Sequence, residues 1–396
     1  MDFRLSDEET AFQEAVRKFG DKVLRPHERQ IDAEGRIPDE VLAEMAHLGL
    51  LAMPVPTEYG GMGASATLTE IAAEEVGRGD FSMATAVFFL LEAGWGHILA
   101  THGTEEAKRE VLPPVCAGKA FLGIATTEPT GGSDLARMRT ASRKAGDGFV
   151  LRGEKSFVSG VEEAKRLGGG HLTLSRADEG GFRFTYVPTR TDGISTQKFE
   201  NLGRMGISTG ALTYQDARVP ARYLLGTDGH GFDIAMEGFS VARTFVAAAC
   251  IGAAERALET GMAYIRERQA FGQPLGKFEG IQFELVDLWT QVEAVKWQCR
   301  RAAWLLDTYT LRGDDSHRSE VNRAVASVKL MAPQVAFESV KRVMMWYGAA
   351  GYTKDVGLEL GFRGIMSYLV GAEGGLNIMR IILGRELLGK EFVPYK

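Results

Sequence analysis

The chain has 396 residues, of which 45% are hydrophobic and 25% are charged, and its formal net charge is −6. This balance is typical of a folded globular protein of two or three domains rather than a disordered chain, and the negative charge argues against sequence-independent binding to nucleic acid. Three distant cysteines, Cys116, Cys250 and Cys299, indicate neither a disulfide framework nor a CxxC site, so we expect no metal site.

Residues 1–118 are predicted to form an α-helical domain. The N-terminal segment has neither the apolar core of a signal peptide nor the composition of a transit peptide, and no run of about 18 apolar residues follows, so we expect a cytoplasmic protein without a membrane span. Ser6 and Glu9 match a capping box at the start of a first helix. Its apolar positions are Phe12, Val16 and Phe19. Later helices are expected at residues 67–77, 81–101 and 105–117.

Residues 119–228 are predicted to form a β-barrel-like domain. Short runs such as "FVLRGEKSFVSG", "GFRFTYVP" and "GALTYQDARVP" are rich in β-branched and aromatic residues and are separated by Gly, Asp and Pro. In the second run, Phe182, Phe184 and Tyr186 fall on one face of a strand. A central β domain therefore follows the helices.

Residues 229–396 are predicted to form a four-helix bundle. Apolar residues from Ile281 to Leu306 alternate spacings of four and three, which is typical of a long bundle helix. After the polar turn "RGDDSHRSE" another long helix is expected, and Pro333 is expected to kink or split it. The predicted fold class is α+β, mostly α.

Four stretches are hard to explain by packing alone. "GIATTEPTGGSDL" (123–135) is rich in hydroxyl and backbone hydrogen-bond donors, although by itself it would be interpreted as a turn. "GEKSFVSG" (153–160) puts an aromatic ring and a hydroxyl on one side of a strand. In "RERQAFGQPLGKFEGIQ" (266–282), Arg268 and Phe271 could provide a cation and an aromatic surface for a ligand. The alternative interpretation is a salt-bridged C-terminal end of a helix. The glycines of "YGAAGYTKD" (347–355) permit close approach of a ligand or backbone.

In this order, the four stretches resemble the hallmark motifs of the acyl-CoA dehydrogenase family, and the resemblance covers nearly the whole chain. It implies that FAD binds between the β domain and the C-terminal bundle, and that an acyl-CoA thioester is oxidised to its 2,3-enoyl form. It also implies a homo-oligomer, a dimer or tetramer with shared FAD sites, and an electron-transfer flavoprotein as redox partner.

The resemblance also implies roles for individual residues. The implied cofactor-binding residues are Thr126, Thr127, Ser133, Phe157, Ser159, Arg268, Phe271, Gln282, Gly348 and Gly351. Of these, Arg268, Phe271 and Gln282 are expected to reach the FAD of a neighbouring subunit. The implied substrate-binding residues are Ser133, Ser240 and Gly374.

One carboxylate, Glu373, precedes the helical run "LNIMRIILGREL". Carboxylates are common at helix N-termini for electrostatic reasons alone. The resemblance implies instead that Glu373 abstracts the α-proton while the β-hydride goes to flavin N5, with Arg243 beside it. Some family members take their base from the helix of Arg243, but the corresponding residue here is Ala242, and Glu237 lies on a different face.

The sequence departs from the family pattern near this base. Gly375 replaces a usual threonine, and one extra residue near Gly371 and Ala372 predicts a displaced loop. Ser240 replaces a frequent aspartate, which leaves a carrier-protein-bound thioester open as the substrate. An oxidase, and a flavin-binding relative with little dehydrogenase activity, remain alternative functions.

Overall fold

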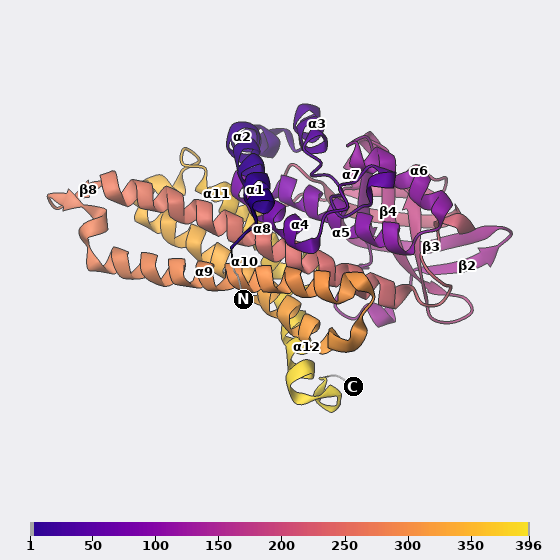
Figure 1. The fold of residues 1–396 in the computed structure, drawn as a ribbon. Helices are drawn as coiled ribbons and strands as arrows, with labels where there is room; N and C mark the ends of the chain where they lie inside the picture. The colour runs from indigo at the N-terminus through magenta and orange to yellow at the C-terminus, as the bar shows by residue number, and fades with distance from the viewer. Residues whose placement is uncertain (1–3, 395–396) are drawn as a thin grey trace.

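The structure, a computed structural model, describes residues 4–394. Figure 1 shows helices of the N-terminal region above a set of long helices, with a β region at one end of the molecule. The C-terminal helix projects away from the body. The predicted α+β, mostly α fold with helical, β and helical regions in that order is confirmed.

The N-terminal region is helical, as predicted. Ser6 Oγ accepts the backbone N–H of Glu9, and the Glu9 carboxylate accepts the N–H of Ser6 at 2.8 Å, so the predicted capping box is present. The helix predicted at 81–101 begins only at Ala84, because Met83 has a left-handed φ of 62°. The Asp80 carboxylate binds the N–H of Ser82 before the helix and that of Thr85 in its first turn. The helices are α1 (Asp7–Phe19), α2 (Arg25–Glu34), α3 (Asp39–His47), α4 (Ala66–Gly79), α5 (Ala84–His102) and α6 (Glu105–Cys116).

The β region is one curled seven-stranded sheet. Strand β4 pairs parallel to β1 and antiparallel to β5, while β7 lies antiparallel between β3 and β6. A short helix, α7 (Val161–Arg166), was not predicted. The strands are β1 (Phe121–Ala125), β2 (Ala141–Ala145), β3 (Gly148–Ser159), β4 (Gly169–Ala177), β5 (Phe182–Pro188), β6 (Ile194–Lys198) and β7 (Thr209–Pro220).

The C-terminal region consists of long packed helices. The stripe predicted between residues 281 and 306 is buried from Leu288 onward, whereas Ile281 and Leu285 are half-buried. The predicted split at Pro333 is wrong, because α10 continues through it. A proline removes only one helical N–H, and the buried packing around Ala332 and Val335 holds the helix together. The elements are α8 (Gly231–Glu267), β8 (Gln269–Ala270), β9 (Gln273–Pro274), α9 (Glu279–Thr308), α10 (Arg318–Trp346), α11 (Leu358–Val370) and α12 (Leu376–Leu388).

Helices α4 and α8 pack with their backbones in contact. A Cβ added to Gly77 would lie 2.1 Å from the carbonyl oxygen of Ala249, and one added to Gly252 would lie 1.8 Å from that of Glu74. Any larger side chain at either glycine would have to push the two helices apart. Helices α5 and α8 are long and apolar enough to span a membrane, but 83% of each apolar window is buried inside the protein, so they are core helices.

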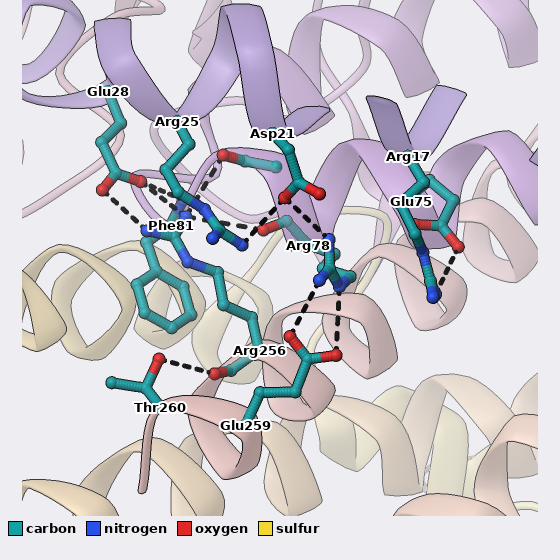
Figure 2. A network of polar contacts seen from close by, with 11 residues as sticks. Arg17, Asp21, Arg25, Glu28, Glu75, Arg78, Phe81, Arg256, Glu259 and Thr260 are labelled. Carbon is teal, nitrogen blue, oxygen red and sulfur yellow. Dashed lines mark hydrogen bonds and ion pairs between the residues drawn. The ribbon is translucent and has the colours of Figure 1, made fainter. Parts of the chain in front are cut away.

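A network of ion pairs joins the N-terminal helices to α8 (Figure 2). The Arg256 guanidinium binds both carboxylate oxygens of Glu28, at 2.7 and 2.8 Å, and lies 4.0 Å from the centroid of the Phe81 ring. Nearby, Arg78 binds both Asp21 and Glu259. Because Arg256 and Glu28 are both buried, removal of either partner would leave an unpaired buried charge.

Candidate active site

Glu373 lies in a strained loop between α11 and α12. The helix ends at Val370, and the backbone then takes positive φ angles at Ala372 (21°), Glu373 (61°) and Gly374 (105°). Positive φ is unfavourable for residues with a Cβ and persists only where the surrounding structure imposes it, often at functional sites. The unusual backbone angles thus fall at the position where an extra residue is predicted, near Gly371 and Ala372.

Arg243 of α8 holds this loop. Its Nε donates a 2.8 Å hydrogen bond to the backbone carbonyl of Glu373, and its guanidinium lies 5.3 Å from the centroid of the Phe239 ring. A Cβ at Gly374 would lie 3.5 Å from Arg243 Nη2 and 3.2 Å from Met379 Cε. The structure thus brings together Glu373, Arg243 and Gly374, which the sequence placed in one site.

The surroundings of Glu373 shift its ionisation. Loss of solvation raises the pKa of Glu373 to about 7, although the positive charges of Arg243 and Lys329 act in the opposite direction. Burial also lowers the pKa of Arg243 to about 10 and that of Lys329 to about 8. Lys329 is fully buried, and its Nζ donates to the carbonyl of Tyr368 at 2.7 Å. A carboxylate with a pKa near neutrality suits general base catalysis.

Ser240 lies about one turn before Arg243 on α8 and is half-buried. Its Oγ donates to the backbone carbonyl of Met236 at 3.2 Å. Glu237, on the same helix, is paired with His102 of α5 at 2.9 Å. The alternative carboxylate on α8 is therefore engaged in another contact, away from the Arg243 loop.

A buried ion pair anchors the turn that contains Thr126, Thr127 and Ser133. Lys155 Nζ donates to the carbonyl of Thr126 at 2.9 Å and to Glu128 Oε1 at 3.0 Å. The Glu128 carboxylate also accepts the backbone N–H groups of Arg139 and Thr140. Thr126 is buried, Thr127 is half-buried and Ser133 is exposed. The buried ion pair therefore holds the buried side of the turn, and Ser133 lies on its exposed side.

Phe157 is presented by a bulge in β3. The register with β7 shifts between Lys155 and Val158, and Phe157 has a φ of 56°. Bulges re-aim side chains, and here 69% of the Phe157 surface is exposed, with its ring edge-to-face to Phe199. Ser159, two residues on, is half-buried. An exposed aromatic ring therefore stands near a hydroxyl group.

The other predicted cofactor residues lie at the opposite end of the molecule. Figure 1 shows the β8–β9 hairpin at the end of the bundle farthest from the β region. Arg268 caps α8 before this hairpin, and Phe271 in it has a φ of 51° and is 97% exposed. The Tyr264 and Tyr347 rings, which stack 3.7 Å apart, bring the segment Gly348–Tyr352 to the same end.

The remaining residues of this end make local contacts. Gln282 Nε2 donates to the carbonyl of Gly276 at 2.6 Å. Gly348 has a φ of 61°, and a Cβ on Gly351 would lie 2.0 Å from the Met344 carbonyl oxygen, so both positions suit glycine. One chain does not bring these residues near Phe157 and Ser159.

Sequence profiles for the N-terminal, middle and C-terminal domains of acyl-CoA dehydrogenases match residues 6–119, 123–217 and 229–388. The chain belongs to the acyl-CoA dehydrogenase family. A probable acyl-CoA dehydrogenase of Bacillus subtilis, YngJ, is 32% identical over 390 residues, covering 98% of this chain and 100% of the relative. A solved glutaryl-coenzyme A dehydrogenase in complex with glutaryl-CoA has a TM-score of 0.91 at 28% identity, with 100% and 99% of the two chains covered.

The cofactor of this acyl-CoA dehydrogenase is FAD. A similar glutaryl-CoA dehydrogenase from Mycobacterium smegmatis was solved with FADH2 and has a TM-score of 0.89 at 25% identity. The match covers 99% of this chain and 97% of that protein. The side chains present fit such a group, because the exposed ring of Phe157 offers an apolar surface to a planar ligand and Ser159 a hydrogen-bonding group. The predicted family, enzyme class and cofactor are confirmed.

Several residues around this acyl-CoA dehydrogenase site were missed by sequence reasoning. Lys155 and Glu128 fix the hydroxyl-rich turn, but neither belongs to a sequence pattern that indicates a buried ion pair. Lys329 had a usable signal, since it is a lone cation in the apolar run "AVASVKLMAPQVA". Within residues 4–394, no group of three or more potential metal ligands comes together.

Proposed function

We propose that this enzyme catalyses the FAD-dependent α,β-dehydrogenation of an acyl-CoA thioester, with Glu373 as the base. The observation that carries this proposal is the Glu373 carboxylate itself. Its loop is strained and tied to Arg243, and its pKa is raised to about 7 by burial. A thioester α-proton is weakly acidic, so its removal needs a carboxylate of raised basicity held in place.

In the proposed reaction Glu373 takes the α-proton, and the bonding electrons become the new C=C bond as a hydride leaves the β-carbon. The bound flavin supplies the hydride acceptor at N5. Arg243 holds the Glu373 backbone and stabilises its ionised form. Gly374 takes a φ of 105° beside Arg243, which a residue with a side chain rarely adopts, and a Cβ there would lie 3.2 Å from Met379 Cε.

The ligand contacts divide between the β region and α8. Thr126, Thr127, Phe157 and Ser159 would hold the flavin, with Ser159 near N5, because their turn and bulge are fixed by the sheet. Ser133, Ser240 and Gly374 would contact the substrate. Ser133 also serves the cofactor phosphates in this proposal. We propose domain boundaries after residues 118 and 228.

A homo-oligomer is part of the proposal. The β8–β9 hairpin lies at the end of the bundle away from the β region. The residues at or beside it would therefore serve the FAD of a second subunit in a dimer or tetramer: Arg268, Phe271, Gln282, Gly348 and Gly351. The ring of Phe271, which is 97% exposed within one chain, supports this assignment because it is open to contact by a second subunit or its cofactor. We further propose an electron-transfer flavoprotein as the oxidant and a cytoplasmic location.

Ser240 supports a second candidate, a dehydrogenase for carrier-protein-bound acyl thioesters. The half-buried hydroxyl carries no charge where an aspartate is frequent in the family. The two candidates differ in the carrier and share the chemistry at Glu373.

Anaerobic bleaching of the yellow enzyme tests both candidates. The oxidised enzyme is mixed with straight, branched and cyclic acyl-CoAs, and separately with the same acyl groups on a carrier protein. We expect at least one acyl-CoA to bleach the flavin within seconds. Bleaching only by carrier-bound groups would select the second candidate, and no bleaching by any thioester, while dithionite still reduces the flavin, would reject both.

A further inference from the structure

Lys329 of α10 is a fully buried cation near the proposed base. Its Nζ donates to the backbone carbonyl of Tyr368 at 2.7 Å, and among residues 4–394 no carboxylate forms an ion pair with it. A buried charge without an ion pair is costly, and apolar replacements of buried ionic groups are often neutral or stabilising. The stability of the fold therefore does not explain why a lysine stands at this position.

The carbonyl that Lys329 binds lies in the last turn of α11. The N–H of Gly371 donates to the carbonyl of Ser367 at 3.0 Å, and the helix ends there. The carbonyls that follow Ser367, beginning with that of Tyr368, have no partner within the helix. Lys329 supplies a donor for the Tyr368 carbonyl, and a cation is favoured at a helix C-terminus. Lys329 thus fixes the point at which the chain leaves α11.

The same point is the start of the loop that carries Glu373. Residues 369–372 connect Tyr368 to Glu373, and Arg243 Nε holds the far end of this stretch through its 2.8 Å bond to the Glu373 carbonyl. Val370, within the stretch, is 71% exposed, so packing of its side chain does little to fix it. A strained backbone persists only where its surroundings impose it. The bonds from Lys329 and Arg243 are two such restraints, one at each end.

The two donors come from helices that pack against each other, since Arg243 belongs to α8 and Lys329 to α10. Arg243 and Cys250 lie about two turns apart on α8 and therefore on the same face of that helix. Cys250 is fully buried and acts on the ionisation of Lys329, which places the lysine against this face. The packing of α8 on α10 thus sets the distance between the two ends of the loop.

The charge of Lys329 also acts on the base. The charged groups that face Glu373 are Arg243 of α8, Lys329 of α10 and Arg204 of the β6–β7 connection. The groups that face Lys329 are Arg243, Glu373 and the thiol of Cys250. Burial lowers the pKa of Lys329 to about 8, so it still carries a charge at neutral pH. That charge lowers the pKa of Glu373 against the larger effect of burial.

We propose that Lys329 is a positioning residue for the base. Its bond to the Tyr368 carbonyl sets where the Glu373 loop leaves α11, and its charge favours the ionised Glu373 carboxylate. This inference rests on the proposed dehydrogenase function and adds to it a residue on α10 that acts through the backbone of its neighbour. Arg243 and Lys329 then share one task, with one end of the loop each.

The test compares FAD-loaded Lys329→Met with the parent in stopped-flow anaerobic flavin bleaching, using an acyl-CoA that bleaches the parent. We expect the limiting rate to fall by roughly 10- to 100-fold, while the half-saturating concentration changes by less than about threefold. The pH midpoint of the rate should move upward, because a charge that lowers the pKa of Glu373 is lost. Lys341→Met is the matched control on α10, since Lys341 is 40% exposed and pairs with Glu338 of the same helix, and it should leave rate and midpoint unchanged.

Hydrogen exchange of residues 369–375 tests the position of the loop without catalysis. We expect exchange to be about tenfold faster in Lys329→Met and unchanged in Lys341→Met. Lys329→Gln keeps a polar group without the charge, and it should move the pH midpoint upward even if Lys329→Met does not fold.

A parental limiting rate and a parental pH midpoint in Lys329→Met would overturn the inference and leave the proposed function standing. Failure of both Lys329→Met and Lys329→Gln to fold with FAD would also overturn it, because the lysine would then serve the stability of the subunit. If no thioester bleaches the parent, the proposed function fails. In that case parental hydrogen exchange in Lys329→Met still overturns the positioning of the loop by Lys329, and faster exchange still supports it.

Discussion

Arg243 donates its hydrogen bond to the backbone carbonyl of Glu373, at 2.8 Å, and not to the carboxylate. The arginine therefore restrains the main chain of the loop, while the Glu373 carboxylate faces other groups, among them the Trp95 side chain. Its positive charge still lowers the pKa of Glu373 against the larger effect of burial. Arg243 thus both holds the backbone of the loop and lowers the pKa of Glu373, and mutations can separate these two effects.

Glu373→Gln should stop catalysis without releasing the cofactor. The amide keeps the shape of the side chain but cannot accept a proton, so flavin reduction should slow by about 10²- to 10⁴-fold. Stopped-flow bleaching and the flavin absorbance of the purified protein measure both properties. Glu237→Gln is the matched control, because Glu237 is paired with His102 elsewhere on α8. Normal bleaching by Glu373→Gln would remove this residue from the mechanism.

The rate of flavin reduction should rise with pH around neutrality. Glu373 acts as a base only when ionised, and its pKa is about 7, so the rate should increase from about pH 6 to pH 8 and then level off.

The stability of the fold should change with pH in the opposite direction to the rate. Because the folded state holds this proton more tightly than the unfolded state, the contribution of Glu373 to stability falls as pH rises from about 4.5 to 7 and is constant above that. We therefore expect the melting temperature of Glu373→Gln, relative to the parent, to increase between about pH 5 and 7 and to level off above that. A constant difference would contradict the raised pKa of Glu373.

Two substitutions at Arg243 separate its roles. Arg243→Lys keeps the charge but loses the Nε donor, so flavin reduction should slow by roughly tenfold with little movement of the pH midpoint. Arg243→Met also removes the charge, so the midpoint should move upward, because the charge lowers the pKa of Glu373. The pH dependence of flavin bleaching distinguishes these outcomes. Identical midpoints in both variants would show that Arg243 acts by position alone.

Glu28→Gln should destabilise the contact between α2 and α8. The change leaves the buried Arg256 guanidinium without its anion, which typically costs about 3–5 kcal/mol. Asp134→Asn is the control, because the Asp134–Arg137 pair is exposed and should contribute only about 0–1 kcal/mol. Urea unfolding of both variants gives the comparison. Equal losses would mean that the network in Figure 2 behaves like surface ion pairs.

Phe271→Ala should weaken FAD binding without unfolding the subunit. The side chain is 97% exposed within one chain, so its loss costs the isolated fold little, whereas a shared cofactor site would lose apolar contact. We expect the dissociation constant of FAD to rise by about tenfold or more, with the melting temperature of the apoprotein unchanged. Arg266→Ala, exposed in the last turn of α8, is the control. Equal flavin retention in both variants would contradict a role for the hairpin.

The elements that depend on local pattern were predictable from the sequence. The capping box at Ser6 and Glu9 is a reciprocal pair of hydrogen bonds within one turn, so four residues suffice to specify it. The stripe from Leu288 to Leu306 repeats over many turns, which leaves little ambiguity about the buried face. The start of α5 was misplaced, because Met83 has a left-handed φ of 62°, which the pattern does not reveal.

The surroundings of Glu373 were not predictable from one sequence. Trp95, Arg204 and Lys329 lie far from Glu373 along the chain. Although Lys329 stands out as a lone cation in an apolar run, no local pattern places any of the three beside Glu373. Their meeting depends on how three separate elements pack, which helical and strand periodicity do not encode. The same holds for the unbroken α10, where packing outweighs the expected effect of Pro333.

The direct backbone contact of α4 with α8 bears on how substrate enters. At Gly77 against Ala249 and Gly252 against Glu74 the two backbones meet without a side chain between them, so neither point can repack during sliding or hinging. The N-terminal helices and the bundle should therefore move as one rigid body. Breathing motions that admit a thioester are then left to the Gly371–Gly375 loop and the boundary with the β region, and hydrogen exchange should be slowest at the α4–α8 contact.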